Sequence, residues 1–207
     1  MEIPGRIDTL DELTAMYHRP SERALGKQLD HIDVGMAEFI DLSPLLILST
    51  TDGKDSVDAS PRGGPPGFVR RLDERHVAIP DLNGNNRLDS YRNIVTHGRA
   101  GVLMIVPGKD ETLRINGPAA VTTDPGILAG FTEELRTPKA AIVIETAEIY
   151  GHCAKAFRRA QVWDPDAWAA FATAPDLAAM YSCMWQIDEP EIRAVLEQSY
   201  ESDLAQD

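Results

Sequence analysis

The stretch IPDLNGNNRLD, residues 79–89, connects a predicted strand to a predicted helix. A β-rich run at 76–80 enters this Gly/Asn-rich bend, and a helix leaves it. Asn85 or Asn86 is expected to be the N-cap of that helix. Apolar residues then recur at helical spacing and a glycine follows at the C-cap position: Leu88, Tyr91, Ile94, Val95 and Gly98. The segment therefore predicts a strand, a bend and a helix in succession.

The start of this helix has the chemistry of an anion site. The N–H groups of a first helical turn lack intrahelical partners and carry a partial positive charge. Asn85, Asn86 and Arg87 place amide and guanidinium donors beside them. The bend is thus a candidate cradle for a phosphate or another anion. The alternative is an ordinary capped helix that binds nothing.

Around this unit the sequence predicts short strands in the middle of the chain and helices at both ends. Strands without alternating helices favour a small barrel or closed sheet over βαβ units. We therefore expect a mainly β, single-domain protein with six or seven strands, in which helices at 1–43 and 151–207 flank a core at 44–150. The expected strands lie at 44–50, 56–62, 68–72, 76–80, 100–106, 112–121 and 140–149.

The composition excludes several classes of protein. A hydrophobic content of 43% with 26% charged residues is typical of a soluble globular protein. The longest apolar runs, at 44–48 and 100–107, are too short to span a bilayer. The N-terminal residues 1–6 lack the basic and apolar regions of a signal peptide. We therefore expect no membrane association and a cytoplasmic location.

The charge distribution indicates a local anionic ligand. A net charge of −13 disfavours binding to nucleic acid, whose phosphates would be repelled. Of the 20 cationic residues, 15 are arginine, and eight of these lie between Arg62 and Arg114. An arginine-rich middle in an acidic chain suits a small anion better than a polymer.

The two cysteines, Cys153 and Cys183, are too few for a disulfide framework and form no metal-binding motif with histidines. We expect no metal site, and the sequence leaves a single bridge between the two cysteines open.

Three further polar groups could serve a phosphorylated ligand together with the bend. Ser60 and Arg62 lie on one predicted strand, and Thr112, Arg114 and Asn116 alternate with apolar residues on another. A fourth set has the spacing of a single helix face: His152, Lys155, Arg158 and Arg159. The alternative for this last set is a solvated basic helix face.

Several motifs, in order along the chain, resemble the pyridoxamine 5′-phosphate oxidase-like FMN-binding split-barrel family. They are DASPRGGPPGFV at 58–69, IPD at 79–81 with GNNRLDS at 84–90, and ETLRING at 111–117. The run HCAKA at 152–156, with the arginines and Trp163 that follow, is similar to the C-terminal segment of a bacterial subgroup with the pattern SPRG…GNNR…LR-NG. The resemblance covers roughly residues 20–170.

This resemblance implies a split β-barrel and a homodimer with two FMN molecules in clefts between the protomers. It places Ser60 and Arg62 beside the flavin, and Asn85, Asn86 and Arg87 at the phosphate. The other residues that it assigns to the cofactor are Pro80, Thr112, Arg114, His152, Lys155 and Arg158.

The chain also departs from the true oxidases. Those enzymes carry Arg-x-x-Leu-Leu-Lys where this chain has Ser60-Pro61-Arg62-Gly63-Gly64, and their C-terminal Trp/Arg pattern for substrate phosphate has no counterpart here. These departures leave FMN binding as an expectation but put oxidation of pyridoxamine phosphate itself in question, so we expect an FMN-dependent oxidoreductase acting on an unknown small molecule. The alternatives are a non-catalytic FMN reservoir or sensor and, less well supported by motifs, a phosphohydrolase.

Overall fold

The computed structural model describes residues 3–131 and 135–207. Its N-terminal part holds three helices, α1 (Leu10–Ala15), α2 (Glu22–Leu25) and α3 (Val34–Leu42). The sequence of residues 20–32 predicts one continuous helix, but α2 is shorter. It ends at Gly26, and Leu29 beyond it exchanges two backbone hydrogen bonds with Ile149, at 3.0 and 2.8 Å.

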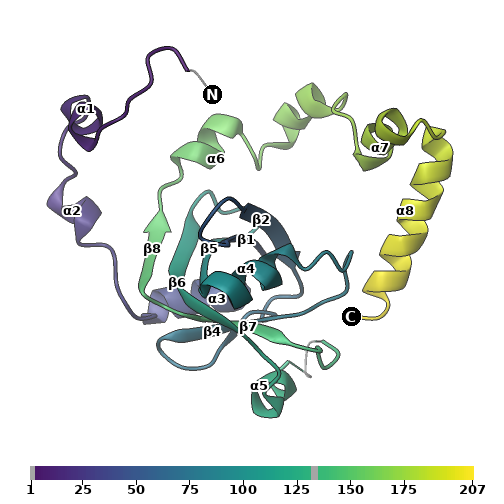
Figure 1. The fold of residues 1–207 in the computed structure, drawn as a ribbon, viewed down its shortest axis with the longest axis horizontal. Coiled ribbons are helices and arrows are strands. Elements are labelled where there is room, and N and C mark those ends of the chain that lie inside the picture. Colours follow the sequence, from purple (N-terminus) through teal and green to yellow (C-terminus); the bar gives the residue numbers. More distant parts are fainter. Residues whose placement is uncertain (1–2, 132–134) are drawn as a thin grey trace.

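The centre of the molecule is one antiparallel sheet of eight strands among the described residues, which confirms the mainly β fold class with helical ends (Figure 1). Hydrogen-bonded neighbours follow the order β2-β1-β5-β6-β7-β4-β3, and β8 pairs with β6. The path does not return to its first strand, so the barrel is split rather than closed. The strands are β1 (Leu45–Thr51), β2 (Val57–Gly63), β3 (Arg70–Arg71), β4 (His76–Pro80), β5 (Arg99–Ile105), β6 (Thr112–Thr122), β7 (Ala141–Glu145) and β8 (Glu148–His152).

The single strand predicted at 140–149 is in fact two strands, β7 and β8. Thr146 and Ala147 separate them, and their N–H groups donate to the carbonyl oxygens of Arg75 and Asn116 at 2.7 and 3.0 Å. β7 pairs with the second half of β6, whereas β8 pairs with its first half. The long strand β6 therefore exchanges one neighbour for another at its middle, near Gly117.

Helix α4 (Asp89–His97) packs against the inner face of this sheet, on β1, β2, β5 and β6. Its amphipathic pattern buries Ile94 in the core, and Gly98 ends it in a left-handed conformation, as predicted. Buried Asn93 donates to the Thr50 hydroxyl at 3.1 Å, which fixes the helix to β1. The core around it is aliphatic, with Leu46, Leu48, Ile79, Met104, Ile115, Ile142 and Ile144 fully buried.

After the barrel the chain is helical. α5 (Pro125–Ala129) lies before β7, and the C-terminal region contains α6 (Lys155–Ala160), the 3₁₀ helix η1 (Pro165–Phe171), α7 (Leu177–Trp185) and α8 (Glu189–Leu204). These last elements leave the barrel at β8 and arch away from it before α8 descends towards the barrel again (Figure 1). Within the described ranges, no helix has the length and apolar character needed to cross a bilayer. The division of the chain into one domain with a 44–150 core remains a prediction, and the last strand runs to His152.

Candidate functional site

A cavity of about 690 Å³ opens where β2, the bend after β4 and the start of α4 meet. Residues 136–139 and the end of α8 complete its wall. Its polar groups come from segments far apart in the sequence. Six of the residues predicted to bind the cofactor line it: Ser60, Arg62, Pro80, Asn85, Asn86 and Arg87.

The bend does not have the local structure predicted for it. The helix begins at Asp89 with Leu88 as its N-cap residue, so the assignment of the cap to Asn85 or Asn86 is wrong. Asn86 and Leu88 both have positive φ, at 56° and 61°, and this left-handed backbone prevents an earlier helix start. The Asn85 side-chain oxygen instead accepts the N–H of Arg87 at 3.0 Å. Among the described residues no side-chain cap bond closes the start of α4, and Asp89, Ser90 and Tyr91 of its first turn line the cavity.

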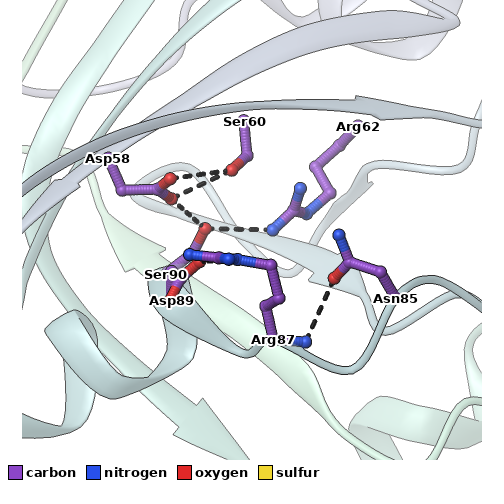
Figure 2. A network of polar contacts seen from close by, with 7 residues as sticks. All are labelled: Asp58, Ser60, Arg62, Asn85, Arg87, Asp89 and Ser90. Carbon is purple, nitrogen blue, oxygen red and sulfur yellow. Dashed lines mark hydrogen bonds and ion pairs between the residues drawn. The ribbon is translucent and has the colours of Figure 1, made fainter. Parts of the chain in front are cut away.

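A polar network crosses the cavity from β2 to α4 (Figure 2). Ser90 donates to Asp58 at 2.5 Å, and Ser60 donates to the same carboxylate at 3.0 Å. The Arg62 guanidinium donates to the Ser90 hydroxyl at 3.0 Å and to the Pro61 carbonyl at 2.8 Å. Two of the five N–H groups of Arg62 are therefore fixed, and no further hydrogen bond of this guanidinium is formed within the described residues.

The sequence arguments for the site missed Asp58 and Ser90. Asp58 precedes Ser60 and Arg62 at intervals of two residues, so the three side chains share one face of β2. That alternation is a signal that could have identified Asp58. Ser90 is 32 residues away from Asp58 and only the fold brings it to the carboxylate.

Arg87 presents its charge to solvent at the edge of the cavity. Its Nε donates to Asp89 at 2.7 Å, and 73% of its side chain is exposed. The hydrogen bond to Asp89 and the charge of that carboxylate raise the pKa of Arg87. An ion pair this exposed contributes little to stability, so the guanidinium can change partners at low cost.

Tyr91, the residue after Ser90 on α4, also lines the cavity. Its hydroxyl donates to Asp81 at 3.0 Å, and burial, together with the Asp81 carboxylate, raises the pKa of this phenol. Tyr91 therefore stays protonated at neutral pH and holds Asp81 beside the bend.

The remaining predicted residues lie elsewhere: Lys155 and Arg158 are on α6, and Thr112, Arg114 and His152 are on the face of the sheet that points away from the core, called here the outer face. Strands β1 and β5 lie between β2 and β6 in the sheet. At the usual spacing between neighbouring strands, Arg114 on β6 is therefore about 14 Å from the strand that carries Ser60 and Arg62. In register, Thr112 pairs with His152 and Arg114 pairs with Tyr150. One chain therefore does not bring Thr112, Arg114 or His152 to the cavity.

These outer-face residues form a cationic cluster around an aromatic ring. Arg114 donates to the Tyr150 hydroxyl at 2.8 Å, and the Lys27 ammonium lies 4.8 Å from the centre of the Tyr150 ring. The buried Nε2 of His152 has no hydrogen-bond partner among the described residues. Desolvation, followed by the charges of Arg114 and Lys27, lowers the pKa of His152, so that its ring is neutral at neutral pH.

The prediction that His152, Lys155, Arg158 and Arg159 share one helix face is wrong. His152 ends β8, and α6 begins only at Lys155, because residues 148–152 pair with β6. Arg158 forms an ion pair with Asp110 at 2.9 Å, near a second and shallower hollow of about 440 Å³. Lys155 and Arg158 do not line the main cavity.

Cys153 and Cys183 are both exposed and unbridged. In residues 3–131 and 135–207, no three His, Cys, Asp or Glu side chains are grouped so that they could hold a metal ion.

Comparisons with solved structures find distant similarities only. HupZ of Group A Streptococcus is 19% identical over 58% of this chain and 93% of its own, with a TM-score of 0.47. An FMN-binding protein from Syntrophomonas wolfei is 12% identical over 56% and 88%, with a TM-score of 0.42. An FAD binding protein from Mycobacterium smegmatis is 12% identical over 60% and 97%, with a TM-score of 0.41. No curated protein matches the chain.

A family model gives a firmer assignment. The model described as pyridoxamine 5′-phosphate oxidase matches residues 33–153, a span that begins just before α3 and ends directly after β8. It includes every strand of the split barrel, the bend and α4, and it covers more than half of the 207 residues. The chain therefore belongs to the pyridoxamine 5′-phosphate oxidase family.

Proposed function

We propose that this protein binds FMN in the cavity beside the bend and acts as an oxidoreductase on a small molecule. The observation that carries the proposal is the gathering of Ser60, Arg62, Asn85, Asn86 and Arg87 in one cavity of about 690 Å³. This volume lies within the range of small-molecule sites, and guanidinium and amide donors are the groups that recognise a phosphate.

The residues present fit this cofactor. Asn85, Asn86 and Arg87 would hold the phosphate, with the uncapped first turn of α4 beside them. Ser60 and Arg62, with Asp58 and Ser90 behind them, would hold the rest of the flavin. When bound, FMN supplies hydride or electron transfer, while the protein orients it and tunes its potential. We also assign the chain to the bacterial subgroup with the SPRG…GNNR…LR-NG pattern.

The absorption spectrum of the purified protein tests this proposal. We expect the visible bands of oxidised flavin and, after heat release, a cofactor with the mass of FMN. Reduction by NADH or NADPH, followed by reoxidation when substrate is added, would identify an oxidoreductase. A flavin that no donor reduces would favour the non-catalytic reservoir or sensor. Colourless protein that takes up no added FMN would refute the proposed cofactor.

We further propose that the protein is a homodimer in which the outer face of the sheet meets a second copy. On this face Ile47 and Leu103, which are register partners, lie only half-buried beside Arg114 and its partner Tyr150. β2 ends the strand path of the sheet, so a contact through the outer face that extends past this edge would bring the cationic cluster of one protomer to the cavity of the other. FMN would then lie between the protomers, contacted by Arg62 from one and Arg114 from the other.

Mixing two variants that each bind FMN weakly tests this arrangement. Arg62→Ala and Arg114→Ala are each expected to bind FMN weakly. In a mixed dimer, one site carries both changes and the other carries neither. Random exchange of protomers should therefore restore about a quarter of the wild-type sites, because half of the dimers are mixed and one of their two sites is intact.

FMN titration of the refolded mixture measures the recovered sites, and each variant refolded alone is the control. No recovery in a mixture that light scattering shows to be dimeric would place Arg62 and Arg114 in separate sites.

A further inference from the structure

The last residues of the chain contact the same bend that lines the cavity. The Asp207 side chain accepts the N–H of Asn83 at 2.9 Å, and its main-chain oxygen accepts the N–H of Arg136 at 2.7 Å. The Asn83 side chain donates to the carbonyl of Asp203 at 3.3 Å. Leu204 and Asp207 also line the cavity. The end of α8 is therefore a wall of the candidate site, although it lies about 120 residues from Asn83 in the sequence.

The C-terminal region is acidic, whereas the groups that its end contacts are N–H donors. The cavity is lined by four cations and, apart from Asp207, by the three acids Asp58, Asp81 and Asp89. Residues 188–207 contain seven acids and one base. The segment 81–88 offers N–H and side-chain donors, and Arg62, Arg136 and Lys139 line the same cavity. Asp207 already occupies one N–H of the bend, at Asn83, two residues before Asn85. A carboxylate that accepts an N–H of the bend occupies a donor that a phosphate could otherwise use.

The end of α8 is held to the barrel by few contacts. α8 packs against α7, and it has no comparable packing against any strand of the barrel in the described residues. Leu204 is 74% exposed. A segment held by few contacts can detach without disturbing the barrel, since local opening costs least where buried apolar contacts are few.

We propose that residues 203–207 form an acidic strap that competes with the phosphate of the ligand for the bend. The inference rests on the proposed function, because it concerns access of FMN to the same cavity. With the strap docked, Asp207 neutralises the donors of the bend and covers part of the cavity. Binding of FMN displaces the strap, so the strap lowers the apparent affinity of the protein for its cofactor.

Two substitutions at one position separate charge from hydrogen bonding. Asp207→Ala removes both, and we expect it to bind FMN about tenfold more tightly than the wild type, the typical effect of losing one charge-assisted competitor. Asp207→Asn keeps an acceptor and should lie between the two. Glu197→Ala, which removes an exposed acid from α8 away from the cavity, should match the wild type. The measurement is the Kd from quenching of flavin fluorescence in the full-length protein.

Amide hydrogen exchange gives a second readout, and its comparison of variants needs no flavin. The N–H groups of Asn83 and Arg136 should exchange faster in Asp207→Ala than in the wild type or in Glu197→Ala. In the wild type, saturating FMN should accelerate exchange in residues 200–207.

The outcomes separate the two proposals. Equal FMN affinities for the wild type, Asp207→Ala and Glu197→Ala would overturn the strap and leave FMN binding intact. If the wild type takes up no FMN, the proposed function fails, and the strap is then judged with inorganic phosphate as the probe. Phosphate that leaves exchange in residues 200–207 unchanged, or an Asp207→Ala variant with unchanged exchange at Asn83, would overturn it.

Discussion

Arg62→Ala is expected to lower the affinity for FMN by about 10- to 100-fold, the typical cost of losing charge-assisted hydrogen bonds. Arg62 is the cation on the β2 side of the cavity, and its orientation is fixed by donation to the Ser90 hydroxyl and the Pro61 carbonyl. Its remaining donors are therefore pre-positioned for an anionic ligand. Isothermal titration of the flavin-free protein with FMN measures the change.

The control is Arg92→Ala, because Arg92 is an exposed arginine of α4 that does not line the cavity. It removes the same charge and should leave the affinity unchanged. Arg62→Lys should be intermediate, since lysine keeps the charge but loses the planar donor fork. Equal FMN affinities for Arg62→Ala and Arg92→Ala would show that Arg62 does not contact the cofactor.

The same variant should make the reduction potential of the bound flavin more negative. A cation beside the ring stabilises the anionic reduced form, and its removal withdraws that stabilisation. Spectroelectrochemical titration of FMN-saturated protein measures this shift independently of affinity. An unchanged potential in Arg62→Ala, and likewise in Arg114→Ala, would place both arginines away from the ring.

Local patterns in the sequence were sufficient for most of the barrel. The apolar run at 100–106 and the alternation at 112–121 correspond to β5 and β6, and the polar set Ser60 and Arg62 lies on β2 as expected. Such signals depend on neighbouring residues alone. The prediction for 140–149 was wrong because two strands follow each other directly there, and the break at Thr146 depends on bonds to residues far away in the chain.

The candidate site, too, was predicted only where neighbouring residues carry the signal. The Asn-rich bend was located correctly, but the helix start was not, because nothing in the sequence indicates the left-handed backbone of Leu88. The pairing of Asp58 with Ser90 and of Asp207 with Asn83 joins residues that are 32 and 124 positions apart. Contacts of this range follow from topology, which a single sequence does not state. The separation of Arg114 from Arg62 by two strands also became visible only in the sheet order.

Gly117→Ala is expected to destabilise the protein by about 3 kcal/mol, at the upper end of the usual cost of overpacking. Gly117 is buried at the point where β6 exchanges β8 for β7. A Cβ atom built there would overlap the backbone carbonyl oxygen of Glu145 and would approach the N–H of Ala147. Both obstacles are backbone atoms, so no side chain can rotate to make room, and the crossing of β6 over β7 must open.

Thermal unfolding measures this effect, and for a chain of this size the melting temperature should fall by roughly 6–12 °C. Gly151→Ala is the matched control, since Gly151 lies on the neighbouring strand β8 and an added Cβ there meets nothing within 4 Å. A Gly117→Ala protein that melts together with Gly151→Ala would mean that β6 and β7 can separate at little cost. The close approach of β6 and β7 would then not be needed to keep the two halves of the split barrel in register. Arg114 on β6 could also shift relative to the core without loss of stability.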